Sequence, residues 1–300
     1  MPNQDQVVLI TGASSGFGRV MAETLARKQY RVFATMRNVN DRNAAVATEL
    51  AELAKRESLD LQALELDVTD EVSVERAVGE VLEKCGQIDI LINNAGYGIM
   101  DLSETVTTEQ ARRQFDVNFF GVVRMNRAVL PAMKRRGSGL LIYVSSGAGR
   151  LAFPGMGFYC ASKFAMEALA EIYRYEIAAL GIDTVILEPG AYRTAVADRL
   201  ESGEDPARRA GYGEFAKVPQ ALLQRIRNSR ANPQEFADRV LEIIETPPGQ
   251  RELRYRVGSG GTGGAVERIN TVTDEVQAQL LEVFGITELA KLKTASDRKE

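Results

Sequence analysis

The stretch VVLITGASSGFG (7–18) decides the fold. Its first four residues form an apolar run typical of a short buried strand, and TGASSGFG (11–18) leads directly into a helix-period segment from about Phe17 to Lys28. Glycines in such a turn let the backbone approach a pyrophosphate, and a helix N-terminus adds unpaired N–H groups and a positive dipole. An ordinary glycine turn has the same letters, but the position between strand and helix favours dinucleotide binding.

Outward from this turn, apolar runs alternate with helix-period segments as far as Gly190. Strands separated by helices predict right-handed βαβ crossovers. We therefore expect an α/β fold, a doubly wound Rossmann-type parallel sheet of about seven strands with helices on both faces. Pro131 is expected to bend or divide the longest helix. The expected strands are 7–10, 31–36, 61–68, 89–96, 139–146 and 182–190, and the later helices are 41–57, 71–85, 108–136 and 158–180.

The pattern loosens after Gly190. Residues 191–232 are charged and rich in Arg, Glu and Gly, and we expect them to form the substrate loop. A helix at 233–245 and a strand at 253–257 (LRYRV) complete a cofactor-binding and catalytic domain over residues 1–257. GSGGTGGA (258–265) predicts a flexible linker, since it lacks the Gly-Lys-Ser/Thr ending of a phosphate loop. An amphipathic helix is expected over 273–291, within a C-terminal extension of 258–300.

Composition excludes several classes of function. The 300 residues are 45% hydrophobic and 26% charged, enough for a full core and a solvated surface. The sequence contains no histidine, which excludes Ser-His-Asp and Cys-His hydrolases and imidazole zinc sites, and we expect no metal. The net charge of -4 argues against binding nucleic acid. Acid–base chemistry near neutral pH must then come from carboxylates, lysine, tyrosine or cysteine.

Several features predict a cytoplasmic protein with no membrane partner. Cys85 and Cys160 are far apart and form neither a disulfide framework nor a metal site, which suits a reducing compartment. The first strand begins at Val7 and leaves no room for a signal peptide. No apolar run approaches the length of a bilayer-crossing helix, and the C-terminal KLKTASDRKE (291–300) has no lipidation motif.

Arg37 indicates which nicotinamide cofactor is used. An acidic residue after the second strand would bind the ribose hydroxyls of NAD, whereas an arginine accommodates the extra phosphate of NADP. Here the strand 31–36 is followed by Arg37, and the first acidic residue is Asp41. The alternative is that Arg37 is a solvated surface charge. The pattern favours NADP(H).

Tyr159 and Lys163, in YCASK (159–163), are the candidate proton-transfer pair. Their four-residue spacing places both side chains on one face of a helix. Free tyrosine titrates near ~10, and an ammonium about 4 Å away would lower its pKa by about three units. The same spacing is common in exposed helix pairs, but without histidine Tyr159 becomes the natural proton donor.

Two further polar positions are candidates for chemistry. Ser145 and Ser146 end the strand 139–146 at its carboxyl end, where ligands bind in open parallel sheets. A hydroxyl there would hydrogen-bond a substrate oxygen, and the alternative is a turn serine. Asn118 lies in a helical segment and is either an ordinary helix residue or part of a water relay.

Together these motifs resemble those of the short-chain dehydrogenase/reductase family, in its single-domain branch. TGASSGFG fits the TGxxxGxG of that branch, NNAG (93–96) its sheet-stabilising motif, and YCASK its YxxxK. Ser146 precedes Tyr159 by thirteen residues, the family's spacing, which selects it over Ser145. The resemblance covers residues 5 to about 257. ATMRN (34–38) together with YCASKFAMEAL (159–169) is similar to the 17β-hydroxysteroid and retinol dehydrogenase group.

The resemblance implies roles for individual residues. Tyr159 exchanges the proton with the substrate oxygen, and Lys163 lowers the pKa of Tyr159 and holds the nicotinamide ribose. Ser146 orients the substrate oxygen, and Asn118 supports a proton relay to solvent. The implied NADP(H)-binding residues are Gly12, Ser14, Ser15, Gly16, Phe17, Gly18, Arg37, Asp67, Val68, Asn94, Ala95, Gly96, Tyr159, Lys163, Pro189, Gly190 and Thr194.

The implied function is NADP(H)-dependent interconversion of a carbonyl (ketone or aldehyde) and an alcohol. A catalytically silent NADP-binding regulator on the same fold is the alternative, although such proteins typically lose the tyrosine or the lysine. The glycine spacing disfavours a third possibility, an epimerase or dehydratase of the extended branch. The loop 191–232 does not identify the small-molecule substrate, because it is charged and not obviously steroid-shaped. Family members pair through the helices expected here at 108–136 and 158–180, which implies a homodimer or homotetramer.

Overall fold

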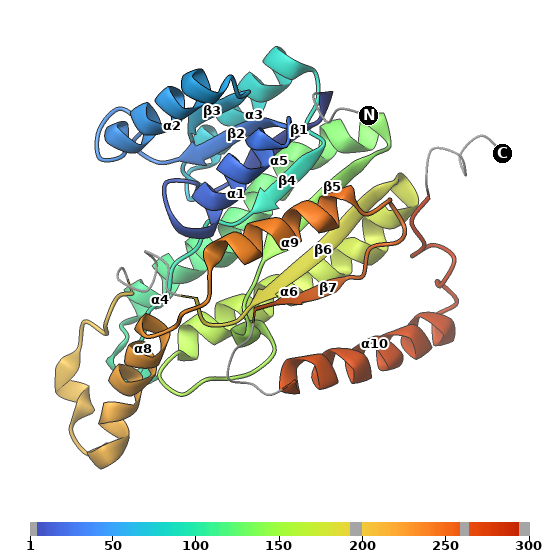
Figure 1. Cartoon of the computed structure of the whole chain (residues 1–300). Helices are drawn as coiled ribbons and strands as arrows, with labels where there is room; N and C mark the ends of the chain where they lie inside the picture. Colours follow the sequence, from blue (N-terminus) through green and yellow to red (C-terminus); the bar gives the residue numbers. More distant parts are fainter. Residues whose placement is uncertain (1–4, 193–199, 259–263, 294–300) are drawn as a thin grey trace.

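A seven-stranded parallel sheet forms the centre of the computed structural model (Figure 1), which describes residues 5–192, 200–258 and 264–293. The strand order is β3-β2-β1-β4-β5-β6-β7, and every neighbouring pair is parallel. This confirms the predicted doubly wound fold. The strands are β1 (Val7–Ile10), β2 (Arg31–Met36), β3 (Leu61–Glu65), β4 (Ile90–Asn93), β5 (Gly139–Val144), β6 (Ile182–Pro189) and β7 (Arg254–Val257).

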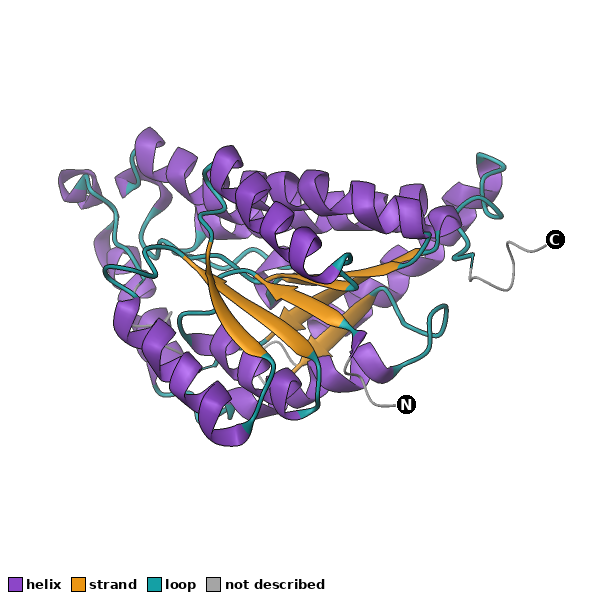
Figure 2. Cartoon of the chain, turned by 90° about the horizontal axis from the view of Figure 1, so that it is seen from above, coloured by secondary structure: helices purple, strands orange, loops and turns teal. Residues whose placement is uncertain are grey.

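Helices cover both faces of the sheet (Figure 2), and the alternation of side chains along each strand supplies both cores. In β1, Val8 and Ile10 pack toward α1, α2 and α9, whereas Val7 and Leu9 pack toward α3, α5 and α6. Each such fully buried side chain contributes about 1.5–3 kcal/mol. These helices are α1 (Gly16–Arg27), α2 (Ala44–Glu57), α3 (Glu71–Cys85), α5 (Gly121–Arg136), α6 (Gly157–Ile177) and α9 (Pro233–Glu245).

The sheet changes its winding direction between β1 and β4. From β1 the chain proceeds outward through β2 to β3, and then crosses back to place β4 on the other side of β1. Loops after these two strands therefore diverge and leave a crevice at the carboxyl edge of the sheet, the position where ligands bind in open α/β folds. The predicted site residues follow the strands at this edge.

The long helix expected at 108–136 is divided, but not at the predicted place. It consists of α4 (Thr108–Phe115), a π-helical turn at Asp116–Phe120, and α5, which continues through Pro131. The π turn carries Asn118, whose side chain is hydrogen-bonded to the backbone of Tyr97 in the loop after β4. The helix is thus interrupted at the π-helical turn, where Asn118 makes a tertiary contact that the spacing of apolar residues along the helix does not reveal.

The C-terminal part departs most from the predictions. The segment expected as loop contains α8 (Val218–Arg227), and the last helix, α10, spans Ala265–Val283 rather than 273–291. Gly264 precedes α10 with a positive φ of 75°. The helically spaced apolar residues that suggested the later boundaries lie on the solvent-facing side of α10, and they therefore do not mark a buried face. Most of the predicted linker, 259–263, lies outside the described residues.

Candidate active site

The glycine turn and the NNAG segment form one hydrogen-bonded unit after β1 and β4. The side-chain amide of Asn94 donates to the carbonyl oxygens of Thr11 (2.8 Å) and Gly12 (3.1 Å). In return, Thr11 Oγ1 accepts from the amides of Asn94 and Ala95, both at 3.0 Å. Gly12 has φ +69°, and a Cβ there would lie 2.8 Å from Ala95 Cα, so a side chain has no room.

The start of α1 has the geometry of an anion site. Gly16, with φ +59°, begins the helix, and the first-turn N–H groups of a helix have no intrahelical acceptors. Because Asn94 is bonded to the Thr11 and Gly12 carbonyls, these oxygens are already paired. The predicted Phe17 packs its ring on Phe236, 4.0 Å between centroids, so only its backbone is available to a cofactor. These residues fit a dinucleotide pyrophosphate.

Arg37 and Asp67 meet at the ends of β2 and β3. Arg37 Nη1 lies 3.7 Å from Asp67 Oδ2, and the arginine side chain is half exposed. Asp67 Oδ1 is held by the backbone and side-chain groups of Thr69, at 2.9 and 2.7 Å. Val68, which was also predicted to bind the cofactor, is buried against α5. A Cβ added at Gly121 would be only 2.8 Å from Val68 Cγ2. The predicted adenosine-contacting residues are therefore side by side.

Helix α6 brings Tyr159 and Lys163 to the crevice on one face, as their spacing predicted. Lys163 is buried, and its Nζ donates to the carbonyl oxygen of Val144 at 2.8 Å and lies 5.9 Å from the centroid of the Tyr159 ring. The loop after β4 approaches both: a Cβ at Gly98 would lie 3.3 Å from Tyr159 Cδ2, and one at Gly96 would lie 3.7 Å from Lys163 Nζ.

The electrostatics of this pair differ from the sequence-based expectation. Burial raises the pKa of Tyr159 to about 12, and a hydrogen bond with Ser146 opposes this increase. Burial likewise lowers the pKa of Lys163 to about 8, against the favourable charge of Glu167. The predicted lowering of the Tyr159 pKa by Lys163 is thus not found, because desolvation dominates and the group that opposes it is Ser146 rather than Lys163. Tyr159 is held as a neutral phenol, the form that donates a proton.

Ser146 and Asn118 adjoin this pair on either side. Ser146 begins the 3-10 turn Gly147–Gly149, and its Oγ accepts from the amide of Ala148 at 3.1 Å. Ser145, by contrast, is buried and donates to Glu167 on the other side of the strand end. Asn118 Oδ1 accepts from the Tyr97 amide (3.1 Å), and its Nδ2 donates to the Tyr97 carbonyl (2.9 Å) and to Ser162 Oγ (3.0 Å). Its amide is fully hydrogen-bonded, which accounts for its burial.

The end of β6 completes the crevice. Pro189 is the last residue of the strand, and the amide of Gly190 donates to the carbonyl oxygen of Val257 at 3.0 Å. Thr194 lies outside the described residues.

An apolar cluster around Tyr159 was not foreseen from the sequence. Met100, Ala148, Met156 and Cys160 form its buried part. Two arginines of the segment 200–217 are paired with acidic side chains, Arg208 with Glu104 and Arg209 with Asp101. The helical spacing of the apolar residues in α8 was the available signal. The residues packed around the buried part are Phe153, Tyr159, Leu200, Leu222, Leu223 and Ile226.

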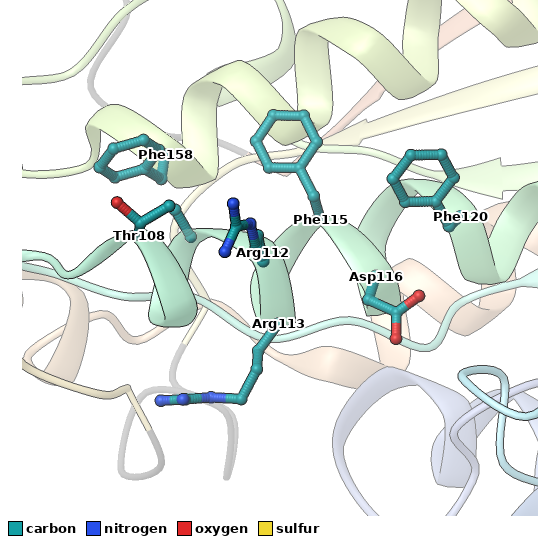
Figure 3. Close-up of a pocket in the computed structure, with 8 residues that line it drawn as sticks. Thr108, Arg112, Arg113, Phe115, Asp116, Phe120 and Phe158 are labelled. Atoms are coloured by element: carbon teal, nitrogen blue, oxygen red, sulfur yellow. The ribbon is translucent and has the colours of Figure 1, made fainter.

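A separate pocket of about 570 Å³ opens on α4, away from these groups (Figure 3). Phe115, Phe120 and Phe158 supply its aromatic walls, and Arg112 and Arg113 its charges. No residue predicted for catalysis or for cofactor binding lines it.

The sequence matches the family model of the short chain dehydrogenases over residues 6–205. The chain belongs to this family. Among curated relatives, 3-ketodihydrosphingosine reductase of Bacteroides thetaiotaomicron is 32% identical over 85% of this chain and 88% of its own. Human 17-beta-hydroxysteroid dehydrogenase type 1 is 36% identical, over 83% of this chain and 76% of its own. Bovine retinol dehydrogenase 8 is 33% identical, over 85% and 84%.

Solved structures give the same assignment. A short-chain dehydrogenase from Streptomyces avermitilis superimposes with a TM-score of 0.74 and 32% identity, covering 94% of this chain and 98% of its own. The predicted similarity to the 17β-hydroxysteroid and retinol dehydrogenase group is therefore confirmed. The protein is an oxidoreductase of a family that uses nicotinamide cofactors to interconvert carbonyls and alcohols. No helix among the described residues combines the length and apolarity needed to cross a membrane.

Proposed function

We propose that this protein is an NADP(H)-dependent reductase of ketones or aldehydes, with Tyr159 as the general acid. The observation that carries the proposal is the placement of Tyr159 on one face of α6 beside the buried Lys163, which is bonded to the end of β5 just before Ser146, at the carboxyl edge of the sheet. Asn118 adjoins the pair through the Gly96 loop. The silent-regulator alternative has no comparable support, because all four groups are retained.

In this mechanism the hydroxyls of Ser146 and Tyr159 both bind the substrate carbonyl oxygen. The nicotinamide cofactor supplies the hydride that forms the new C–H bond. As negative charge develops on the oxygen, Tyr159 transfers its phenolic proton there and completes the alcohol. The Lys163 ammonium stabilises the resulting phenolate. A proton from solvent then restores the Tyr159 hydroxyl through a relay. Asn118 supports this relay by its hydrogen bond to the Tyr97 carbonyl oxygen. Oxidation follows the same steps in reverse.

We assign the cofactor as NADP(H) on the basis of Arg37. This cation directly follows β2, is half exposed, and has only a loose ion pair with Asp67 at 3.7 Å. It is thus available to a phosphate on the ribose, and its planar guanidinium suits bidentate contact with phosphate oxygens. Ser14, in the adjacent turn, is the second candidate donor.

The apolar cluster around Tyr159 supports a substrate with a predominantly apolar skeleton and one reacting oxygen. Met100, Met156 and α8 offer hydrocarbon surface on this side, while nearby charges are paired with each other. The names of three relatives specify a sphingoid ketone, a steroid hydroxyl and retinol, all on largely apolar carbon skeletons. The charged sequence of the loop 191–232 is therefore compatible with an apolar substrate.

We further propose that two chains pair through α5 and α6. Large apolar side chains are exposed on α6 and directly before α5: Phe164 at 42% and Ile172 at 46% on α6, and Phe120 at 49% at the end of the π-helical turn. Phe120 also lines the pocket on α4 (Figure 3). Such clustered exposure is typical of a surface that another protein covers.

The decisive experiment measures NADPH consumption by the purified protein. The panel contains long-chain 3-ketones, 17-ketosteroids and retinal, with short diketones and polar keto acids as controls. We expect turnover of at least one apolar carbonyl compound and its absence in Tyr159→Phe. Reduction confined to the polar controls would contradict the substrate class, and no turnover of any compound, together with tight NADPH binding, would favour the regulator.

A further inference from the structure

Helix α10 attaches to the domain by its polar side. Val272, Val276 and Leu280 are exposed at 60%, 56% and 41%, whereas Asn270 and Thr273 form hydrogen bonds to the domain. A typical surface helix has the opposite arrangement, with its apolar stripe toward the core. Polar contacts therefore determine where α10 lies, beside α6 and β7 (Figure 1).

Asn270 is the centre of these contacts. Its Oδ1 accepts a hydrogen bond from Arg150 Nε at 2.8 Å, and its Nδ2 donates to Glu188 Oε2 at 2.7 Å. Arg150 Nη2 also donates to Thr273 Oγ1 at 2.6 Å, one helical turn further along α10. One amide thus connects two segments that are separated in the sequence.

Both of these segments contain residues of the candidate active site. Arg150 directly follows the 3-10 turn that Ser146 begins. Glu188 is the penultimate residue of β6 and precedes Pro189, at the turn predicted to contact the nicotinamide. Val266, the buried apolar residue of α10, lies close to the Ser146 turn. A Cβ added at Gly147 would be 3.8 Å from Val266 Cγ2.

Glu188 depends strongly on this contact. It is fully buried, and its Oε1 has no hydrogen-bond partner among the described residues; Arg254 Nε, 3.8 Å away, is also without one. Asn270 therefore supplies the side-chain hydrogen bond of a buried carboxyl group. Leaving such a group without a donor is costly, and the end of β6 would have to move to restore one.

We propose that Asn270 is a positioning residue for the reaction, which fixes the Ser146 turn relative to the end of β6 and makes α10 part of the active site. The inference rests on the proposed function for its kinetic consequence, but the contacts themselves do not. Displacement of a catalytic group by about 1 Å can reduce turnover up to a hundredfold.

The test compares Asn270→Ala with Thr271→Ala in the full-length protein. Thr271 is exposed on α10, and its hydroxyl donates within the helix to the Glu267 carbonyl oxygen at 3.0 Å, its one hydrogen bond among the described residues. For Asn270→Ala we expect kcat about tenfold or more below wild type with the KM for NADPH within about twofold, and wild-type kinetics for Thr271→Ala. A purely structural role would lower the melting temperature without lowering kcat of the folded enzyme.

Asn270→Asp provides a second, nearly isosteric variant. It keeps the acceptor for Arg150 but places a carboxylate against Glu188. Its kcat relative to wild type should increase as the pH is lowered, because either carboxyl group then holds a proton and donates it to the other. The charged groups of the surrounding elements are Arg150 after β5, Glu167 and Glu171 on α6, Arg254 on β7 and Asp274 on α10.

Amide hydrogen exchange separates this inference from the proposed function, since it needs no substrate. The amides of Gly149, Arg150 and Leu151 are hydrogen-bonded within the Ser146 turn and should exchange faster in Asn270→Ala, while those of β1 do not change. Unchanged exchange at these amides together with wild-type kcat in both Asn270 variants would overturn the inference. If wild-type protein reduces no carbonyl compound, the proposed function fails, and the exchange data alone decide the role of Asn270.

Discussion

Lys163 Nζ donates a hydrogen bond to the carbonyl oxygen of Val144 at 2.8 Å, which joins the proton-transfer helix to the last residue of β5. Ser146 follows two residues later along the chain. Ser146, Tyr159 and Lys163 are therefore positioned relative to one another by one contact between a helix and the central sheet, whereas Asn118 is held separately by the backbone of Tyr97. Burial of Lys163 in this contact is also the cause of its lowered pKa.

The reduction reaction should lose rate above about pH 8. The pKa of Lys163 lies at about 8, so the ammonium that stabilises the Tyr159 phenolate is lost above this value, whereas Tyr159 itself, with a pKa of about 12, stays protonated. The pH profile of kcat/KM for carbonyl reduction measures this. Lys163→Met should lower kcat/KM about a hundredfold and remove the alkaline limb. A profile that stays flat to pH 10 would show that Lys163 charge does not limit the reaction.

Tyr159→Phe should abolish turnover while cofactor binding persists. The phenyl ring retains the contacts with Gly98 and the apolar cluster, and only the proton donor is removed. General acid catalysis typically contributes about 10²–10⁴-fold, which sets the expected loss. Steady-state kinetics and NADPH fluorescence titration measure the two quantities. Undiminished activity would refute the assignment of Tyr159.

Arg37→Asp should shift the preference from NADPH toward NADH. A charge-assisted contact contributes about 1.5–3 kcal/mol, which corresponds to about a ten- to hundredfold change in the ratio of the two kcat/KM values. The same substitution at Arg42, an exposed residue before α2, serves as the control and should leave the ratio unchanged. An unaltered ratio in Arg37→Asp would contradict the assignment of the phosphate-binding residue.

Glu188→Gln should be more stable than wild type at alkaline pH. Burial raises the pKa of Glu188 far above its ordinary value. A group with a raised folded-state pKa contributes stability at low pH, and this contribution is lost as the pH rises through the folded-state pKa. Glutamine does not titrate, so the difference in melting temperature should increase in favour of the variant from about pH 5 to about pH 9. A constant difference over this range would mean that Glu188 titrates normally.

Phe164→Glu should convert the protein to monomers if α5 and α6 form the interface. A charge at the centre of an apolar contact is costly to bury, whereas it costs little on an exposed surface. Analytical ultracentrifugation measures the oligomeric state, with Val283→Glu on the exposed side of α10 as the matched control. A monomeric wild-type protein would refute the proposed pairing, and dissociation by the control alone would place the interface elsewhere.

Local signals predicted much of the fold. The helices at 71–85 and 233–245 have the predicted boundaries, and both begin at capping residues: Asp70 accepts from the Val72 amide, and Asn232 from that of Gln234, each at 3.0 Å. The glycine turn was likewise recognisable, because Gly12 and Gly16 occupy positions that require positive φ. In these segments the residues that determine the structure are neighbours in the sequence.

The remaining features depend on contacts between distant residues. Arg254 lies within LRYRV, where a charged residue suggests a surface position, yet it is buried because Glu171, 83 residues away, and Asp274, 20 residues away, both bind it. The effect of burial on Tyr159 could not be inferred from its spacing to Lys163. The bounds and orientation of α10 could not be inferred either. Its apolar residues recur with helical spacing, which usually marks the buried side of a helix, but here they face outward.

The polar attachment of α10 gives this helix an unusual thermodynamic character. Apart from Val266, few apolar side chains leave water when it docks, so its release changes the heat capacity and the denaturant m-value little. Ionic strength, which screens the more exposed pair of Arg256 on β7 with Glu267 on α10, acts on it instead. Salt concentration rather than urea or temperature is therefore the variable that separates the docking of α10 from the unfolding of the domain.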